Sequence, residues 1–342
     1  MHEIFRTFMD LIKDEGFLEF QNNLALDIYD GLGQGFSSNE NEVSLVTKLC
    51  EITNGKSYGS VSIRADKIHG SKSYVEFHYK DKPVTKELGD MAIITIVSRG
   101  RERLFQKLCL IQNKKGSNTD SSKNKENVRW DIDLEQLYLL KNFPRLSGNK
   151  GILKHCRDVS FRNTEGSLGA FGLMHFPGDM IFITAPLLTE LMKGRKSLNT
   201  SDISVVGSNC TAGSQNGMGW PFFQYLGKIH PMEFFHMHEK LLHRFGGMWP
   251  HMCGGTVPFL GNTPFLRDIY DFVRSWTQVN IGETSFSFGE VTNTVVDGFS
   301  NSLLRQIGFG ELVDLPINEQ FAEFRWESEL GIAVTHIDIA RE

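Results

Sequence analysis

The chain has 342 residues, of which 40% are hydrophobic and 23% are charged, and its formal net charge is −5. This composition excludes a disordered chain, and the negative net charge excludes a protein that coats nucleic acid through an overall positive charge. No apolar run reaches the roughly 18–20 residues of a membrane-spanning helix.

Residues 1–30 have helical periodicity, and we interpret their start as an amphipathic helix because Asp10, Lys13 and Asp14 exclude a signal peptide. The five cysteines are widely spaced and contain no CxxC pair, which favours reduced thiols and a cytoplasmic location. GLGQGF (31–36) precedes a helix that ends near Gly55. We interpret it as a flexible connector, because no strand precedes it and no GK[ST] follows.

Alternating or apolar runs then predict a meander of three or four strands at SVSIRA (60–65), SYVEFHY (73–79), DMAIITIV (90–97) and KLCLIQ (107–112). The polar run 116–127 predicts a mobile loop, and DLEQLYLLKNFP predicts a helix that stops at Pro144. Two more strands are expected at 168–176 and 180–188.

The second half of the chain is rich in Gly, His, Phe and Trp. It predicts helices at 231–245, 264–276 and 292–307. We therefore expect an α/β (α+β) protein with three parts. These are a core with a mixed central sheet flanked by helices (1–195), a linker or long loop (196–229), and a mainly helical region for recognition or oligomerisation (230–342).

One group of residues carries a chemical signal. Asp90 begins a predicted strand, Gln112 ends the next, and Lys114 lies two residues further on, so the side chains at 112 and 114 point to one face. If the two strands are antiparallel neighbours, all three side chains converge. Oxygen ligands with an adjacent lysine suit a hard divalent cation and the hydrolysis of a phosphodiester. The alternative is that Asp90 only begins the strand, or pairs with Lys86 or Arg99.

The order of a glutamate-bearing helix, then Gly89-Asp90, then Gln112-Asn113-Lys114 resembles the PD-(D/E)XK superfamily of restriction-type and repair nucleases. Gln112 stands where most members have an acid, as in some branches of the superfamily, and Gly89 replaces the usual proline. The resemblance covers roughly residues 30–190 and implies a restriction-endonuclease-like core.

Three glutamates are candidates to complete the site: Glu40, Glu42 and Glu51. Glu42 shares a helix face with the apolar Leu45 and Leu49, whereas Glu51 lies on a polar face. We expect Glu42, although an acid in the first helical turn also suits the helix dipole.

The resemblance implies an Mg²⁺- or Mn²⁺-dependent endonuclease that cleaves DNA, possible self-association or a partner protein, and a role in bacterial defence against foreign DNA. It also implies that Asp90, Gln112 and Glu42 bind the metal ion and that Lys114 orients the attacking water. Residues 99–154 hold thirteen Lys or Arg against six Asp or Glu. From this excess we expect contacts with nucleic acid at Arg99, Arg101, Arg103 and Lys115.

Two other functions are open at this point. Loss of the acid at position 112 fits a catalytically degenerate nuclease fold that binds nucleic acid or assembles a complex. The histidine-rich stretch HPMEFFHMHEKLLH, with His236, His238 and His243, and Cys253 beyond it, contains zinc-ligand types. Its spacing lacks HExxH, so core or interface histidines are the better interpretation.

Overall fold

The computed structural model describes residues 2–67, 73–118, 128–150, 153–203, 262–316, 321 and 330–340. Its helices are α1 (His2–Lys13), α2 (Glu15–Ser37), α3 (Glu42–Thr53), α4 (Leu134–Asn142), α5 (Ala185–Met192), α9 (Ile269–Thr277), α10 (Thr294–Gln306) and the 3-10 helix η3 (Phe309–Glu311). Its longer strands are β2 (Val61–Lys67), β3 (Tyr74–Tyr79), β4 (Lys82–Glu87), β5 (Met91–Arg99), β6 (Glu102–Lys115), β8 (Val128–Asp131), β10 (Gly169–His175), β11 (Asp179–Thr184), β14 (Glu283–Ser287) and β16 (Gly331–Asp338). The short ones are β1 (Ser57–Tyr58), β7 (Ser117–Asn118), β9 (Ser147–Gly148), β12 (Ser197–Asn199), β13 (Phe265–Leu266) and β15 (Glu290–Val291).

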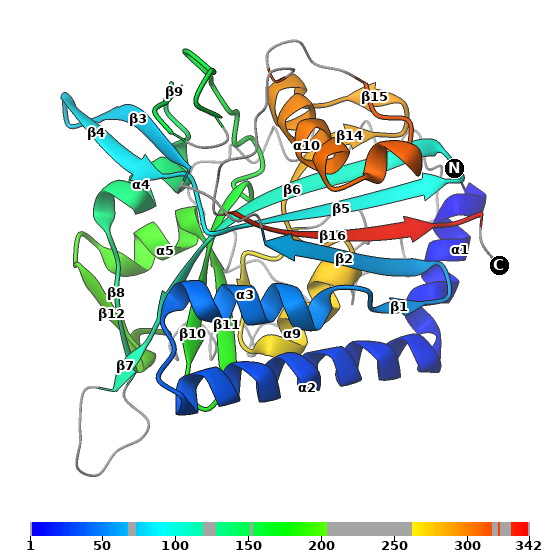
Figure 1. Ribbon diagram of the computed structural model, residues 1–342, viewed down its shortest axis with the longest axis horizontal. Coiled ribbons are helices and arrows are strands. Elements are labelled where there is room, and N and C mark those ends of the chain that lie inside the picture. Colours follow the sequence, from blue (N-terminus) through cyan, green and yellow to red (C-terminus); the bar gives the residue numbers. More distant parts are fainter. Residues whose placement is uncertain are drawn as a thin grey trace, which may run out of the picture.

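A ten-stranded mixed sheet forms the centre of the described structure, in the order β1-β2-β16-β5-β6-β10-β11-β13, with β14 paired to β6 and to β15 (Figure 1). The predicted α/β class, with a large mixed sheet flanked by helices, is therefore confirmed. Every β5 residue from Met91 to Ser98 is buried, which explains its continuous apolar and β-branched sequence.

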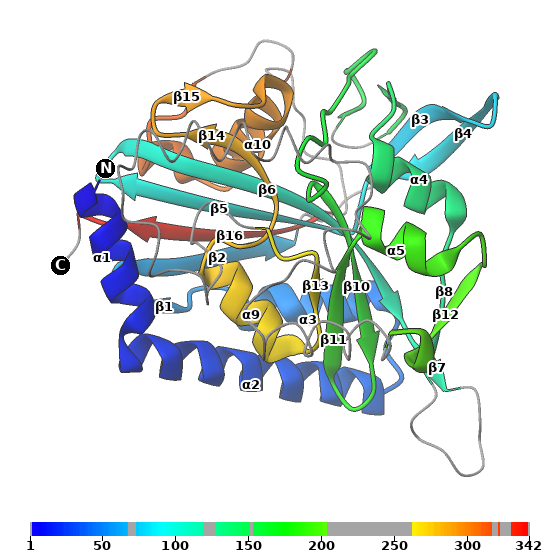
Figure 2. The same ribbon diagram turned by 180° about the vertical axis from the view of Figure 1, so that it is seen from behind.

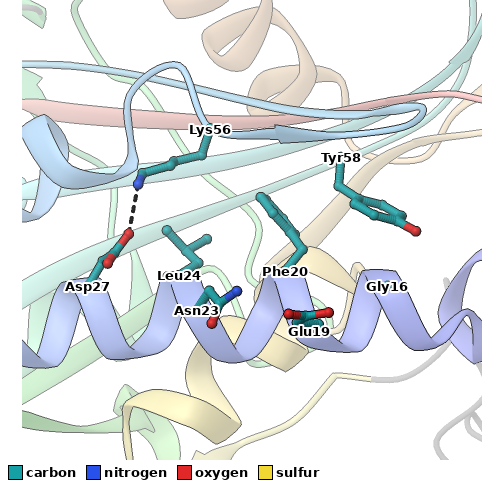
Figure 3. A pocket seen from close by; sticks show the side chains of 8 residues that line it. All are labelled: Gly16, Glu19, Phe20, Asn23, Leu24, Asp27, Lys56 and Tyr58. Atoms are coloured by element: carbon teal, nitrogen blue, oxygen red, sulfur yellow. Dashed lines mark hydrogen bonds and ion pairs between the residues drawn. The ribbon is translucent and has the colours of Figure 1, made fainter.

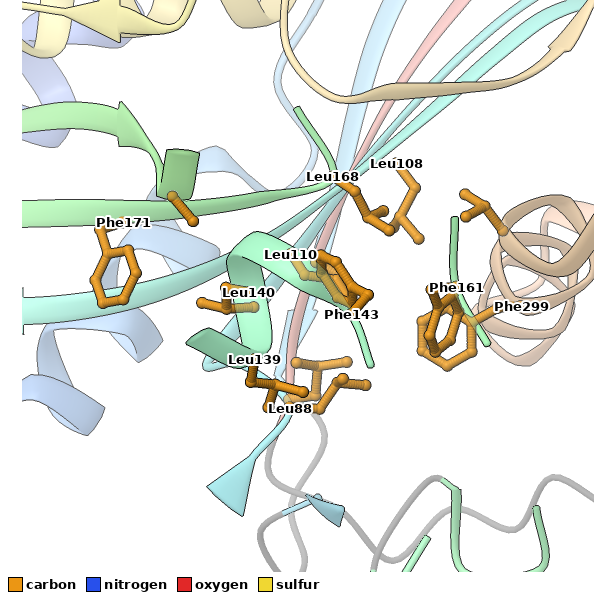
Figure 4. Close-up of a cluster of buried hydrophobic side chains, with 14 of the residues drawn as sticks. Leu88, Leu108, Leu110, Leu139, Leu140, Phe143, Phe161, Leu168, Phe171 and Phe299 are labelled. Atoms are coloured by element: carbon orange, nitrogen blue, oxygen red, sulfur yellow. The ribbon is translucent and has the colours of Figure 1, made fainter. Parts of the chain in front are cut away.

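Helices cover both faces of this sheet (Figure 2). One apolar cluster joins α2, α3 and α9 to one face through residues such as Ile93 and Ile111. A larger cluster joins α4, α5 and α10 to the other face through residues such as Leu108 and Leu110 (Figure 4). Odd- and even-numbered residues of β6 thus face opposite layers, as the two-residue period of a strand requires.

The predicted meander is wrong in two respects. β16 lies between β2 and β5, antiparallel to β2 and parallel to β5. β3 and β4 leave this sheet and form a separate three-stranded sheet with β9. The residues at 331–338 therefore complete the sheet of the expected core, and the predicted boundaries at 195 and 230 do not separate them from it.

The glycine-rich segment 31–36 is helical and belongs to α2, so the predicted connector is wrong. Its glycines serve close packing instead. A Cβ atom at Gly31 would lie 2.2 Å from Ile52, and one at Gly33 would lie 2.6 Å from the carbonyl oxygen of Pro177. A larger residue would clash at these positions, which explains why glycine occupies them despite its low helix propensity.

Two further expectations differ from the structure, and others fall on residues outside the described ranges. The strand expected at 180–188 ends at Thr184, and α5 begins at Ala185 with a proline in its first turn. Within the expected linker, residues 197–199 form β12, which pairs with β8. The helix expected at 231–245 and the polar residues 119–127 lie outside the described residues, as do His236, His238, His243 and Cys253.

Candidate functional site

The candidate site lies where β5 begins and β6 ends, on two neighbouring antiparallel strands. Met91 pairs with Ile111, and the main-chain N–H of Asp90 donates to the Ile111 carbonyl oxygen at 2.9 Å. A short turn holds this register, and Gly100 in that turn has a φ of 60°, which favours glycine. The register places Asp90 beside Gln112, as the sequence pattern predicts.

One carboxylate oxygen of Asp90 accepts two hydrogen bonds from β6. Gln112 Nε2 donates to Oδ2 at 2.5 Å, and the main-chain N–H of Asn113 donates to the same oxygen at 2.7 Å. Among the described residues, no hydrogen bond to the other oxygen, Oδ1, is found. The acid is therefore anchored by one oxygen, and the second has capacity for a ligand.

The Asp90 carboxyl is held at an energetic cost. Its pKa is raised from 3.8 to about 7, first because burial disfavours the charged form and second because Glu87 lies nearby. The Asn113 N–H and the Lys114 ammonium oppose this rise, and Glu42 adds to it weakly. The residue as a whole is only half-buried, so the cost is smaller than for a carboxyl sealed in the core. A perturbed acid in such a place is typical of functional sites.

Glu42 is the first residue of α3 and contacts the end of β6 with both carboxylate oxygens. Oε2 is 3.1 Å from Lys114 Nζ, and Oε1 accepts the main-chain N–H of Lys115 at 3.1 Å. Asn41 caps the helix by accepting the N–H of Ser44 at 2.9 Å, which fixes where α3 begins. Of the three candidate glutamates, Glu42 is thus the one that contacts Lys114.

The other two glutamates have different surroundings. Glu40 forms an ion pair of 3.0 Å with Lys48, and its Oε2 is buried without a hydrogen-bond partner among the described residues. Glu51 is exposed. Neither one contacts Lys114 in the structure.

The residues around Asp90 include polar atoms that are not fully used. Within the described ranges, Gln112 Oε1 and Asn113 Nδ2 are buried and have no hydrogen-bond partner. Buried polar atoms are normally paired. Of these two, only Gln112 Oε1 is an acceptor, and it belongs to the strand face that Gln112 shares with Lys114, so it is the atom that could take a cation. The described part of the chain contains no group of three or more His, Cys, Asp or Glu side chains arranged as a metal site.

The four basic residues expected to bind nucleic acid do not form one surface. Arg99 forms an ion pair with Glu102, and Arg101 forms one with Asp314. Both arginines lie at the turn between β5 and β6. Nine residues of β5 separate that turn from the site, or about 30 Å. The prediction for Arg103 is wrong, because its side chain is 4% exposed and is held by the buried Asp297 at 2.7 Å.

Lys115 is next to the site, but its side chain turns towards the corner between α2 and α3. Its Nζ donates to the carbonyl oxygen of Glu40 at 2.6 Å and to Asn39 Oδ1 at 3.2 Å. It also lies over the Phe36 ring, 5.4 Å from its centroid. In this arrangement Lys115 secures the end of β6 against the α2–α3 corner.

Glu87 was not a candidate from the sequence, although it stands only three residues before Asp90 in KELGD. It is the last residue of β4 and is the largest charge effect on the Asp90 carboxyl. Lys86 forms ion pairs with Asp133 and Glu135 at 2.6 and 2.8 Å instead of pairing with Asp90. Its closeness to Asp90 in the sequence could have marked Glu87 as a candidate. The bend between β4 and β5, which places the two side chains near each other, could not be predicted from the sequence.

A second buried group of ionisable residues lies between β6, β14 and the loop before β10. Lys107 is 1% exposed, and its Nζ donates to Asn262 at 2.8 Å. Burial lowers the pKa of Lys107 to about 8. Burial and Glu165 raise the pKa of Glu283 to about 7, although Thr164 and Glu165 donate to its carboxylate. Asn262 also donates to Glu165, so these contacts tie both β6 and β14 to the loop before β10.

A hollow lies elsewhere, between α2 and the segment that leads into β1 (Figure 3). It has a volume of about 310 Å³, and its lining includes Phe20, Tyr58 and Glu19. Lys56 and Asp27 form an ion pair of 2.7 Å across one end. None of the predicted site residues lines it.

The chain matches no protein-family model, and neither the curated protein sequences nor the solved structures contain a significant match to it. Across the described ranges, no helix combines the length and apolar character needed to cross a membrane. The functional interpretation therefore rests on the site itself.

Proposed function

We propose that the chain is a divergent PD-(D/E)XK nuclease that hydrolyses phosphodiester bonds of DNA with Mg²⁺ or Mn²⁺. One observation carries the proposal. A carboxylate with a strongly raised pKa meets Gln112 at the end of the neighbouring strand, and Lys114 stands two residues further on. The resemblance extends the proposal to defence of a bacterial cell against foreign DNA.

The donor set suits a hard cation. Mg²⁺ in proteins is commonly held by only one or two carboxylates together with waters and substrate phosphates. Asp90 has a free oxygen, and Gln112 Oε1 is a buried acceptor without a partner among the described residues. These two side chains would hold the ion. When bound, it would neutralise charge on the scissile phosphate and lower the pKa of a bound water.

The other side chains act on the substrate. Hydrolysis forms one bond from a water oxygen to phosphorus and breaks the bond to the leaving ester oxygen. One proton passes from the water to the leaving ester oxygen, and the products are a phosphomonoester and a hydroxyl group. Lys114, 21% exposed, presents an ammonium to the negative charge that grows on the phosphate oxygens. Glu42 keeps that ammonium at the site through their 3.1 Å contact.

A second candidate function is a catalytically inactive nucleic-acid-binding or assembly module. It is favoured by Gln112, a neutral amide where most members of the superfamily have a second acid. Gln112 donates a hydrogen bond of 2.5 Å directly to Asp90. Under this alternative the raised pKa of Asp90 has no catalytic use. The two candidates differ in one observable, which is cleavage in the presence of a divalent cation.

The test is cleavage of supercoiled plasmid DNA by the full chain with Mg²⁺ or Mn²⁺. We expect wild-type protein to nick or linearise the plasmid, and Asp90→Asn and Lys114→Ala to lower the rate by about 100-fold or more. Lys56→Ala is the matched control, since it removes a lysine from an exposed ion pair of similar length. It should cleave at the wild-type rate.

Two results decide against the proposal. Cleavage retained by both site variants would mean that the activity does not arise at Asp90 and Lys114. Absence of cleavage of both DNA and RNA by wild-type protein with either metal, together with measurable DNA binding, would establish the inactive module instead.

A further inference from the structure

We infer that Glu42 is a positioning residue for Lys114 and for the end of β6. The catalytic role of Lys114 in this inference rests on the proposed nuclease function, whereas the positioning of Lys114 by Glu42 does not. The family resemblance implies a different role for Glu42, as a metal ligand.

The bonding of Glu42 carries the inference. β6 contacts both oxygens of Glu42, one through the Lys114 ammonium and the other through the main-chain N–H of Lys115, each at 3.1 Å. A carboxylate that accepts from a side chain and from the adjacent main chain fixes that side chain relative to its strand.

The surrounding contacts support the same role. The next side chain on β6, Lys115, reaches back to Asn39 and to the Glu40 carbonyl oxygen, so the α2–α3 corner binds the strand end at several points. Glu42 belongs to that corner, and as the first residue of α3 its position is set by the helix start. Asp90, by contrast, is bound by Gln112 and Asn113.

Position matters for the lysine because a flexible four-carbon side chain would otherwise sample many rotamers. Fixing those rotamers costs conformational entropy. If the ammonium is already held in place before the substrate binds, this cost is not part of the barrier to the reaction. Glu42 would therefore act on the rate of the chemical step through Lys114. It would have little effect on the metal concentration that the reaction requires.

The first test does not depend on activity. Trace acetylation of the full-length protein, followed by peptide mass spectrometry, reports how accessible each lysine amine is. We expect Glu42→Gln to raise the labelling rate of Lys114 by about two- to five-fold, the range for a partly exposed ion pair. Glu51→Gln, an exposed acid on the same helix, should leave it unchanged. An unchanged Lys114 rate in Glu42→Gln would overturn the inference.

The second test uses cleavage over a series of Mg²⁺ concentrations. We expect Glu42→Gln to lower kcat by about 10- to 100-fold while the half-saturating Mg²⁺ concentration changes by less than about two-fold. In Glu42→Gln/Lys114→Met the loss should be no larger than in Lys114→Met alone, because one residue acts through the other. A half-saturating Mg²⁺ concentration raised about ten-fold, with kcat restored at high Mg²⁺, would identify Glu42 as a metal ligand and refute the inference.

The two tests separate the possible failures. If the wild-type protein cleaves no nucleic acid, the proposed function fails, and the labelling experiment still decides whether Glu42 holds Lys114. If cleavage occurs and labelling is insensitive to Glu42, the function stands and the positioning role is wrong.

Discussion

Replacing Asp90 by Asn should make the folded protein more stable at neutral pH. The isosteric amide keeps an oxygen that can accept from Gln112 Nε2 and from the Asn113 N–H, the two bonds that hold Asp90. It removes the charge that burial and Glu87 disfavour. The rise of the Asp90 pKa from 3.8 to about 7 sets a ceiling of about 4 kcal/mol, at about 1.4 kcal/mol per pH unit. Because the residue is half-buried, we expect about 1–2 kcal/mol.

The pH dependence gives the sign of the effect. The folded-state pKa of Asp90 lies above its unfolded-state value, so between about pH 4 and pH 7 the folded protein binds more protons than the unfolded chain. The contribution of this group to stability therefore falls as pH rises through that window and is constant above it. The stability difference between Asp90→Asn and wild type should be near zero at pH 4 and should reach its full size above pH 7.

Urea unfolding followed by circular dichroism at several pH values measures this difference. Asp27→Asn is the control, since Asp27 forms an exposed ion pair and its loss should change the free energy of unfolding by no more than about 1 kcal/mol. Added Mg²⁺ should stabilise wild type at pH 8 and leave Asp90→Asn unchanged. If Asp90→Asn is no more stable than wild type at pH 8, the carboxylate is not held at a cost and the site has lost its main physical support.

Three other substitutions test the rest of the description. Arg103→Met should destabilise the protein by about 3–5 kcal/mol in urea unfolding, because it leaves the buried carboxylate of Asp297 without its partner. Glu165→Gln should lower the pKa of Glu283, visible by NMR of ¹³C-labelled carboxyl groups, since the charge of Glu165 contributes to raising it. Gly33→Ala should destabilise the protein by about 1–3 kcal/mol in thermal unfolding, despite the better helix propensity of alanine, because the new Cβ would meet a backbone carbonyl oxygen at 2.6 Å. A more stable Gly33→Ala variant would show that the close packing of α2 is not what selects glycine.

The sequence predicted the contact between Asp90 and Gln112 because that contact is local in the chain. A short turn joins β5 to β6, and the register of such a hairpin follows from the apolar pattern and the position of the turn. Glu42 was also identifiable, because helical spacing distinguishes it from Glu51 on the same helix. These are the parts of the site that depend on short-range order.

The parts that the sequence did not predict depend on distant segments. β16 enters the sheet between β2 and β5 from the end of the chain, and nothing in the local pattern of β5 indicates its neighbour. From its basic neighbours in the sequence, Arg103 is expected to be exposed to solvent. It is buried instead, because it pairs with Asp297, which lies 194 residues later in the chain. The glycines of 31–36 were misinterpreted for the same reason, since their neighbours belong to other elements.

The charged group at Arg103 and the one at Asp90 differ in how their charges are compensated. Arg103 and Asp297 neutralise one another, and Gln106 and Asn301 bond to them, as expected where ions only join elements. At Asp90 the nearest carboxylate influence, from Glu87, is unfavourable, and the acceptor oxygen of Gln112 has no partner among the described residues. Folding alone would favour a neutral residue at position 90. Under the proposed function, a bound divalent cation would offset this cost by favouring the charged form of Asp90.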